Sequence, residues 1–421
     1  MIQTGIIENA HGDLVTDVAY DFYGLRLATC SVDQRIKVWQ LDETNGTWTV
    51  EDDWKAHAAA VSKLSWAHPE FGAIIASASF DHSVKIWEQV RATDEPAPGI
   101  NGAADGASAG PSRWVERAIL TDARASVRSL EFAPHHFGLK LATVSSDNRI
   151  RVYECLEQPS LTTWQLCDEI DASSLPPSSA HTRGANTRAI ATPTQPHGAH
   201  DSAPAPLVTQ ALNSASLQQA QRAPAPPNAE ADGGWCVSWC KDRYWGEVLA
   251  AAAGTSSAVR IIELSPSRRP TTLLTLNPAP GAITSGGMDV DEGAQTSSPY
   301  AVTSVSWAPS CGRSYHLIAT GGRDGRVRIW RVKPGPEDDE SEDASAGWTA
   351  SIVGDFDQHK SAIGRVEWNI TGTVLSSAGN DGFVRLWKAT SGNVWRPAGS
   401  IGVQEAEKVD SAEKDEEMDT C

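Results

Sequence analysis

The side chains most suited to metal chemistry in this sequence are two adjacent histidines, His135 and His136, and two nearby cysteines, Cys236 and Cys240. Both residue types bind transition metals. No histidine or further cysteine is clustered with the cysteine pair in sequence, so we interpret the two as small buried residues of strands. The histidines lie in FAPHHFGLKLA, which has the pattern of a solvent-facing turn between two strands. The sequence therefore predicts no metal site and no cofactor.

Five aspartates recur at a constant spacing that does not suggest acid–base chemistry. Each lies six residues before a Trp or Tyr: Asp33, Asp81, Asp147, Asp324 and Asp381. Asp381-Gly382 stands between two β-type runs, and this dipeptide predicts a tight hairpin turn. We expect the aspartates to cap turn amides, which is a structural role. Because the sequence also has no Gly-rich phosphate loop, HExxH or GxSxG motif, we expect no catalytic residues and no enzyme.

The hairpin turns belong to a longer repeat. Upstream of each turn, the preceding strand carries an aromatic or equivalent residue: Tyr20, Trp66, Phe132, Trp239, Trp307 and Trp368. Three copies also place a histidine nine residues earlier, at His11, His57 and His359, and a weaker copy has Ser256 in place of the aspartate. This is the pattern of WD repeats, in which His, Asp, a strand hydroxyl and Trp form hydrogen bonds within one blade. Six copies predict an all-β, six-bladed β-propeller.

The repeats account for about 260 residues, at about 40–45 residues per blade. We therefore expect one propeller domain at residues 1–403, with insertions at about 91–112, 172–233, 277–299 and 334–346, followed by an acidic tail at 404–421. The insertions and the tail have few aromatics and no apolar periodicity. Such segments do not bury enough apolar surface to order themselves, so we predict that they are disordered.

The formal net charge of −18 is concentrated outside the repeats. Residues 334–346 carry six acidic groups and no basic one, and residues 404–421 carry eight acidic and two basic groups. This acidity argues against direct nucleic-acid binding by those segments. No run of about 18 apolar residues is present, so no transmembrane segment is predicted. The N-terminal residues also lack the pattern of a secretory signal, and we expect reduced cysteines in the cytosol or nucleus.

Several stretches resemble one family among the WD-repeat proteins. They are WAHPEFG (66–72), FAPHHFGLKLATVSSDNRIRVYE (132–154), GRSYHLIA (312–319) and WNITGTVLSSAGNDGFVRLWK (368–388). These stretches resemble the Seh-type WD-repeat nucleoporin and, less closely, its sister, the Sec-type propeller of the COPII vesicle coat. GRSYHLIA and the RVYE ending of the third repeat favour the Seh type. The resemblance covers the six blades but not the insertions or the tail.

The resemblance implies an open six-bladed propeller whose missing blade is donated by a partner. The implied partners are the α-solenoid nucleoporin of the Y-shaped complex and other subunits of that complex, at the nuclear pore in the nuclear envelope. The implied function is that of a scaffold for protein and mRNA transport. The same family also serves the SEA/GATOR complex at the vacuole or lysosome, which controls TOR signalling. Two alternatives remain, a COPII coat propeller and a closed-ring adaptor that binds a peptide in its channel.

The sequence after the last repeat independently favours an open ring. Residues 393–401 predict a fourth strand for blade 6, so the N-terminal strand is not needed to complete that blade. A seam between blades 1 and 6 would then expose sheet edges and apolar faces, which a partner could cover by adding strands. We expect the seam to be lined by Ile6, Val15, Val18 and Tyr20 on one side and by Ile363, Val366 and Trp368 on the other. The alternative for each side chain is a place in the core of its own blade.

Overall fold

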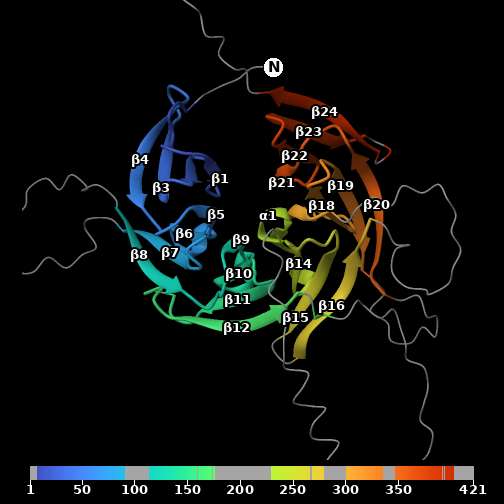
Figure 1. The fold of residues 1–421 in the computed structure, drawn as a ribbon, viewed down its shortest axis with the longest axis horizontal. Helices are drawn as coiled ribbons and strands as arrows, with labels where there is room; N and C mark the ends of the chain where they lie inside the picture. The colour runs from blue at the N-terminus through green and yellow to red at the C-terminus, as the bar shows by residue number, and fades with distance from the viewer. Residues whose placement is uncertain are drawn as a thin grey trace, which may run out of the picture.

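The computed structural model describes residues 7–90, 113–175 without 159 and 173, 229–278 without 266 and 267, 300–334, and 347–402 without 391 and 393. Six four-stranded sheets are arranged around a central axis (Figure 1). The predicted six-bladed β-propeller is confirmed. The predicted insertion at 91–112, most of those at 172–233, 277–299 and 334–346, and the tail at 404–421 lie outside the described residues.

Every blade is an antiparallel meander of four strands in chain order. Blades 1 to 3 consist of β1 (Val15–Tyr20), β2 (Arg26–Ser31), β3 (Arg35–Asp42) and β4 (Thr47–Lys55); β5 (Val61–Trp66), β6 (Ile74–Ser79), β7 (Val84–Val90) and β8 (Arg113–Leu120); and β9 (Val127–Phe132), β10 (Lys140–Ser145), β11 (Arg149–Cys155) and β12 (Trp164–Asp171). The first strand of each blade lies nearest the axis, and the first strands of successive blades pack against one another from β1 to β9.

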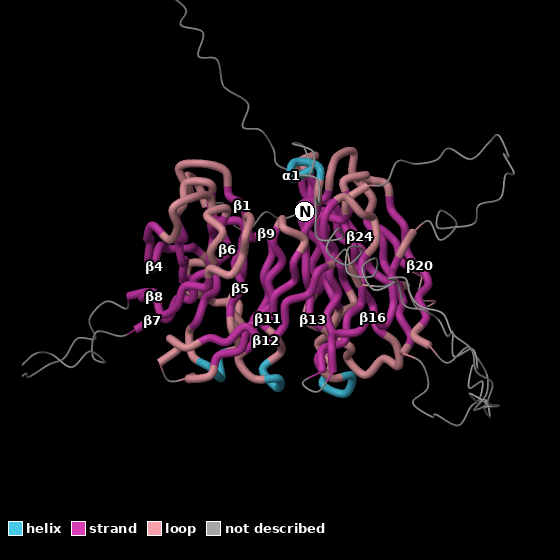
Figure 2. Tube along the Cα trace, turned by 60° about the horizontal axis from the view of Figure 1, so that its bottom comes forward, coloured by secondary structure: helices cyan, strands magenta, loops and turns pink. Residues whose placement is uncertain are grey.

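Blades 4 to 6 continue the ring with the same order of strands. They consist of β13 (Gly234–Trp239), β14 (Glu247–Gly254), β15 (Val259–Ser265) and β16 (Arg268–Leu276); β17 (Val302–Trp307), β18 (His316–Gly322), β19 (Val327–Lys333) and β20 (Thr349–Phe356); and β21 (Ile363–Trp368), β22 (Val374–Gly379), β23 (Phe383–Ala389) and β24 (Trp395–Gly402). Short 3-10 helices, η1 (Pro69–Phe71), η2 (His135–Phe137) and η3 (Arg243–Trp245), form the turns between first and second strands of blades 2 to 4. They lie at one end of the ring, opposite the short helix α1 (Figure 2).

Two boundaries in the middle of the chain differ from the sequence prediction. The repeat pattern predicts that blade 4 ends near Leu264, but β16 adds an outer strand that reaches Leu276. Pro270 weakens the strand pattern of this segment in the sequence, but an outer edge strand tolerates proline. Helix α1 (Ala229–Asp232) lies at the end of the predicted insertion at 172–233. Within the described residues, no helix is both long enough and apolar enough to cross a lipid bilayer.

Tertiary contacts explain why helix α1 is ordered. The Arg323 guanidinium donates hydrogen bonds to the carbonyl oxygens of Ala231 and Gly233, and the Ser146 hydroxyl donates to Glu230 at 2.9 Å. These contacts come from blades 5 and 3, so the sequence around α1 could not reveal them.

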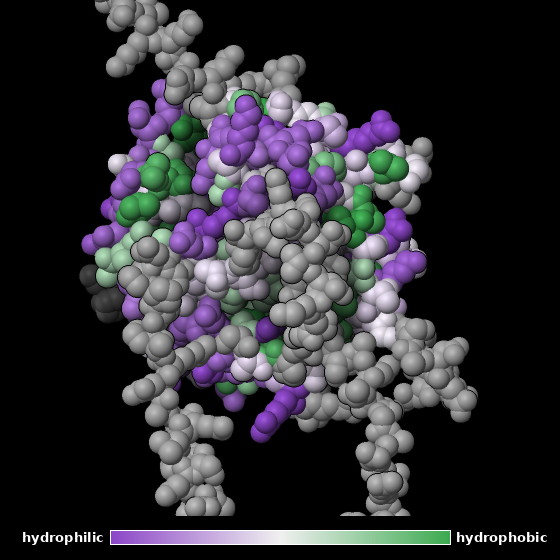
Figure 3. Space-filling model, turned by 45° about the vertical axis from the view of Figure 1, so that its right-hand side comes forward, coloured by the Kyte–Doolittle hydropathy of each residue, from purple (hydrophilic) through white to green (hydrophobic). Residues whose placement is uncertain are grey.

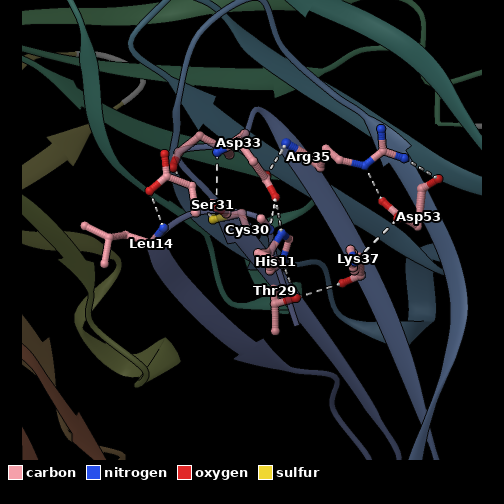
Figure 4. A network of polar contacts seen from close by, with 12 residues as sticks. His11, Leu14, Thr29, Cys30, Ser31, Asp33, Arg35, Lys37 and Asp53 are labelled. Carbon is pink, nitrogen blue, oxygen red and sulfur yellow. Dashed lines mark hydrogen bonds and ion pairs between the residues drawn. The ribbon is translucent and has the colours of Figure 1, made fainter. Parts of the chain in front are cut away.

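The recurring aspartates lie at the hairpins between the second and third strands. In blade 1, His11 lies between Asp33 and Thr29 (Figure 4), with Nδ1 3.0 Å from the Asp33 Oδ2 and Nε2 2.8 Å from the Thr29 Oγ1. The Trp39 indole donates to the same hydroxyl at 2.9 Å. Equivalent tetrads occur in blades 2 and 6: His57, Asp81, Ser77 and Trp87, and His359, Asp381, Ser377 and Trp387.

The electrostatics of these tetrads hold the aspartates in the charged form. Burial by itself raises the pKa of Asp81, but the hydrogen bond from Ser83 and the charge of His57 outweigh it and lower the pKa to about 2. Burial also lowers the pKa of His57. The carboxylate is therefore charged in the folded protein, where it accepts the backbone N–H groups of Ala58 and Ser83.

We expect Asp381→Ala to lower the free energy of unfolding by about 1–3 kcal/mol, because the change leaves buried donors unpaired. Asp381 accepts hydrogen bonds from His359, Arg385 and the backbone N–H of Phe383. Urea denaturation would measure the loss. The exposed Asp357 provides the matched control, and Asp357→Ala should change stability by less than about 0.5 kcal/mol. If Asp381→Ala instead left the free energy of unfolding unchanged but abolished partner binding, Asp381 would be a contact residue.

His316 gives the fold a distinct dependence on pH. This buried side chain lies among Trp245, Trp307 and Trp348, with ring centroids 5.7, 5.3 and 5.9 Å away. Neither of its ring nitrogens has a hydrogen-bond partner among the described residues. Burial lowers the pKa of His316 to about 4, so the folded state keeps the ring neutral at neutral pH.

The sign of the resulting effect is fixed by proton linkage. Between pH 6.5 and pH 4 the unfolded chain binds a proton at His316 that the folded chain does not, so stability falls as the pH falls. The loss from this residue should approach about 3 kcal/mol, and His316→Phe should remove it. Urea denaturation of both proteins at pH 7 and pH 4.5 would measure the difference. An equal loss in the two proteins would contradict the assignment to His316.

Candidate partner-binding seam

The ring of blades is interrupted between blade 1 and blade 6 (Figure 1). Strand β24 pairs with β23 in antiparallel register, with Val384 opposite Ile401 and Lys388 opposite Arg396. The fourth strand of blade 6 is therefore supplied by the chain after Trp387, as the sequence predicted. Residues 7–14 at the N-terminal side form no strand. The described residues thus contain no strand that joins the first blade to the last.

Elsewhere, most neighbouring blades are joined by one or both of two kinds of hydrogen bond between their inner strands. A hydroxyl of one blade donates to the first carbonyl of the next inner strand: Thr16 to Val61 at 2.5 Å, Ser62 to Val127 at 2.6 Å and Thr303 to Ile363. An indole N–H donates back to the preceding blade, at 3.0 Å in each case: Trp66 to Ala19, Trp239 to Glu131 and Trp368 to Ser306.

The residues at the seam lack both kinds of bond. Gly364 occupies the position of the joining hydroxyl in blade 6 and has no side chain to donate a hydrogen bond. Tyr20 occupies the position of the indole in blade 1, and 60% of its surface is exposed. These two residues do not cause the interruption by themselves, because joined blades can also lack one kind of bond: blade 3 has Arg128 at the hydroxyl position and Phe132 at the indole position.

The face of blade 1 toward the seam is apolar and uncovered. Val15 is 45% exposed and Val18 is 38% exposed. The equivalent apolar residues of the other blades are buried against the preceding blade: Val61, Leu64, Val127, Leu130, Phe132, Val237, Trp239, Val302, Val305 and Trp307. Since the side chains are of the same kind, the difference comes from the absent neighbour.

The opposite face of blade 6 is uncovered in the same way. The residues three and five positions after the hairpin residue are buried in blades 1 to 5: Ile36, Val38, Val84, Ile86, Ile150, Val152, Val259, Ile261, Val327 and Ile329. In blade 6 these positions are Val384, which is 38% exposed, and Leu386, which is half-buried. Phe383 and Ile401 beside them are also exposed. We call the two apolar faces, Val15, Val18 and Tyr20 with Phe383, Val384 and Leu386, the seam faces.

The structure corrects half of the predicted seam. Ile363, Val366 and Trp368 are buried with Leu317 and Ile329 in the core between blades 5 and 6. The physical reason is the common direction of the blades around the ring. Residues at these positions of an inner strand face the preceding blade, and only blade 1 has no preceding blade beside it. Ile6, the remaining predicted seam residue, lies outside the described residues.

One side-chain bridge crosses the seam near the central axis. Arg365 of blade 6 donates to the carboxylate of Asp17 and, at 2.6 Å, to the carbonyl of Val18 in blade 1. The Asp17 carboxylate also accepts a hydrogen bond from the Lys63 ammonium of blade 2 at 2.9 Å. Analysis of the sequence missed Arg365, although a signal exists: Asp17, Lys63 and Arg365 stand three residues before the repeat aromatic in consecutive blades around the ring.

The candidate ligating residues are not assembled into a metal site. His135 and His136 lie in the turn at η2, where His135 stacks on His68 with ring centroids 4.1 Å apart. Cys236 and Cys240 are buried, and burial raises the pKa of each thiol to about 12. In the part of the chain that the structure describes, no group of three His, Cys, Asp or Glu residues could hold a metal ion.

Comparison with known proteins agrees with this architecture. The family model for the WD domain, G-beta repeat, matches residues 3–40, 48–88, 293–331 and 350–388. Similar relatives include Nucleoporin SEH1 of Saccharomyces cerevisiae, at 31% identity over 94% of this chain and 99% of the relative. Nucleoporin seh1 of Schizosaccharomyces pombe is also 31% identical, over 94% of this chain and 95% of the relative. Nucleoporin SEH1 of Homo sapiens is 34% identical over 93% of this chain and 86% of the relative.

These relatives match nearly the whole chain at more than 30% identity, and they match it across all six blades. The repeat pattern, the six-bladed architecture and the identity to these relatives agree with one another. The chain therefore belongs to the SEH1 nucleoporin family of WD-repeat β-propeller proteins.

Proposed function

We propose that this chain is a structural scaffold subunit of the nuclear pore whose seam receives a blade donated by an α-solenoid nucleoporin. The name of its relatives, nucleoporin, supports the location. The observation that carries the mechanism is the pair of seam faces: the residues that are buried between all other blades are exposed only on the two sides of the seam. The proposed role is assembly and not catalysis.

The energetics of the seam favour a strand-donating partner. A three-stranded blade would bury on the order of 2,000 Å² or more, which is the size of an obligate interface. Its apolar side chains would cover Val18 and Val384 as a neighbouring blade does elsewhere in the ring. Because the contacts are mainly apolar, the complex should resist salt.

Insertion also requires a change at the inner edge of the seam. A strand placed between β1 and β21 must displace the Arg365 guanidinium from the Val18 carbonyl and from Asp17. Asp17 retains Lys63 as a partner, so its charge stays paired when the bridge opens. We therefore infer that the Arg365 bridge closes the free chain and opens on assembly.

A cross-link across the bridge tests this mechanism. Cysteines would replace Val18 and Arg365 in a chain whose Cys167, Cys311 and Cys421 are changed to serine, and a short bis-maleimide would join them. Tagged protein would then capture partners from a nuclear-envelope extract for identification by mass spectrometry. We expect the untreated variant to retain a helical-solenoid nucleoporin and the cross-linked protein to lose it. Equal capture by the cross-linked protein would show that the seam is not the binding site.

The alternatives predict different behaviour in the same experiment. A closed-ring adaptor would capture its partners equally with and without the cross-link, and it would bind short peptides in its channel. A COPII coat propeller would capture coat subunits instead of nucleoporins. The other partners that the resemblance implies, the further Y-complex subunits and the SEA/GATOR subunits of TOR signalling, would be identified by the same capture. The names of the relatives support the pore and give no support to the vacuole surface.

A further inference from the structure

A basic cavity of about 330 Å³ lies between blades 5 and 6, on the side of blade 6 away from the seam. Its charged lining residues are Arg313 from the turn between β17 and β18, Arg331 of β19 and Lys388 of β23. Its volume falls within the range of small ligand sites, which begins at about 300 Å³. The proposed function above does not use this cavity.

Both arginines are held in place by uncharged groups. Arg313 donates to the carbonyl oxygens of Pro309 and, at 3.1 Å, of Gly372. Gly372 has a φ of +60°, and a Cβ there would come within 2.7 Å of the Pro309 oxygen, so glycine permits this close approach. Arg331 stacks over the ring of Tyr315 at 4.9 Å. The cations are therefore positioned before any ligand binds.

The charges of this cavity are not neutralised within the described residues. No carboxylate lies within ion-pairing distance of Arg313, Arg331 or Lys388 in this part of the chain. The Nε atoms of both arginines are buried without a hydrogen-bond partner. Buried donors and charges without partners are costly, so an anionic ligand would gain both hydrogen bonds and charge pairing.

The remaining lining indicates what kind of anion fits. Leu317, Ala389, Tyr315 and Trp395 give the cavity an apolar wall. The outer surface on this side of the ring mixes hydrophilic with separate hydrophobic groups (Figure 3). A peptide that carries carboxylates on a partly apolar chain matches both the cations and the wall.

We propose that this cavity binds an acidic peptide segment of a partner protein, with Arg313, Arg331 and Lys388 pairing its carboxylates. Carboxylates suit the planar donor fork of arginine, and Lys388 adds a point charge at the rim. Because the contacts are ionic and partly exposed, binding should weaken as salt concentration rises.

Fluorescence anisotropy of the full chain with a fluorescein-labelled hexaglutamate peptide tests the proposal. We expect saturable binding that weakens at least tenfold in Arg331→Gln and in Lys388→Gln. Lys85→Gln is the matched control and should stay within twofold, because Lys85 is already paired with Glu116 at 2.7 Å. Lys388 is exposed, so its variant keeps the test valid if Arg331→Gln impairs folding.

Two results would overturn the proposal. Equal affinity of wild type, Arg331→Gln and Lys388→Gln would place the binding elsewhere. Binding that appears only after the six acidic residues within 337–343 are changed to Asn or Gln would identify the chain's own acidic segment as the occupant.

Discussion

Val18→Asp is expected to weaken capture of the proposed blade-donating partner by two orders of magnitude or more while leaving the propeller folded. Val18 is 38% exposed in the free chain, so an aspartate there keeps access to water. In the complex the same carboxylate would be buried against an apolar blade without a partner. Burying an unpaired charge costs several kcal/mol, which corresponds to at least a hundredfold loss of affinity.

The repeat provides an unusually close control for this experiment. Leu64 occupies the position of Val18 in blade 2 and is 3% exposed, because blade 1 covers it. Leu64→Asp should therefore unfold or strongly destabilise the free chain. Val384→Asp, on the other side of the seam, should reproduce the behaviour of Val18→Asp. Titration of partner capture and thermal denaturation would measure the two effects separately.

The outcome distinguishes the seam from any other binding surface. If Val18→Asp and Val384→Asp both retain the partner with unchanged affinity, the seam faces are not the interface. If they instead lower thermal stability as much as Leu64→Asp does, the two faces are packed against each other in solution. Either result would contradict an open ring that awaits a donated blade.

The fold was largely predictable because each hairpin repeats the same local chemistry. An aspartate six residues before a Trp or Tyr recurs in five blades, and a weaker copy completes the sixth. Local spacing could also predict the fourth strand of blade 6, which the structure places at Trp395–Gly402. It did not reveal β16 of blade 4, because Pro270 interrupts a pattern that an outer edge strand can tolerate.

The location of the seam depends on information that is not local. Alternation along β1 and β21 shows which residues are apolar, but not which neighbouring blade each face meets. Val366 and Val18 occupy the same place in the repeat, yet one is buried and the other exposed. The difference arises from the direction in which the blades succeed one another around the ring. The Arg365 bridge to Asp17 depends on the same arrangement and was missed for the same reason.

In blades 3 and 5, which lack the tetrad histidine, an arginine that is visible in the sequence takes its place. Blade 3 has Ala123 in the position of the tetrad histidine, and Arg151, four residues after Asp147, fills its role. Arg151 donates to Ser145 and to Asp147, at 2.7 Å in both cases. Arg328 bonds Asp324 in blade 5 in the same way. An arginine four residues after the hairpin aspartate, in a repeat that lacks the histidine, could therefore have predicted this ion pair from the sequence.

We expect Arg151→Leu to lower the free energy of unfolding by about 3–5 kcal/mol, the cost of breaking a buried pair by removing one partner. The Arg151 side chain is almost fully buried, and it also pairs with Glu169 at 2.9 Å. Lys37 stands at the same position in blade 1, where the His11 ring already forms a hydrogen bond with Asp33. Its partner, Asp53, is 3.5 Å away and partly exposed, so Lys37→Leu should cost less than about 1 kcal/mol.

The dependence on pH adds a check that packing alone would not satisfy. Burial by itself raises the pKa of Asp147, but its hydrogen bonds from Arg151 and Ser145 lower it below the usual value. The stabilisation is therefore complete above the unfolded-state pKa of about 4 and is lost as the pH falls below it. The gap between wild type and Arg151→Leu in guanidinium denaturation should be wide at pH 7 and should narrow in acid. If the difference in free energy of unfolding between the two proteins stays constant down to pH 3, the loss comes from packing. If Arg151→Leu costs no more than Lys37→Leu, Arg151 does not replace the histidine.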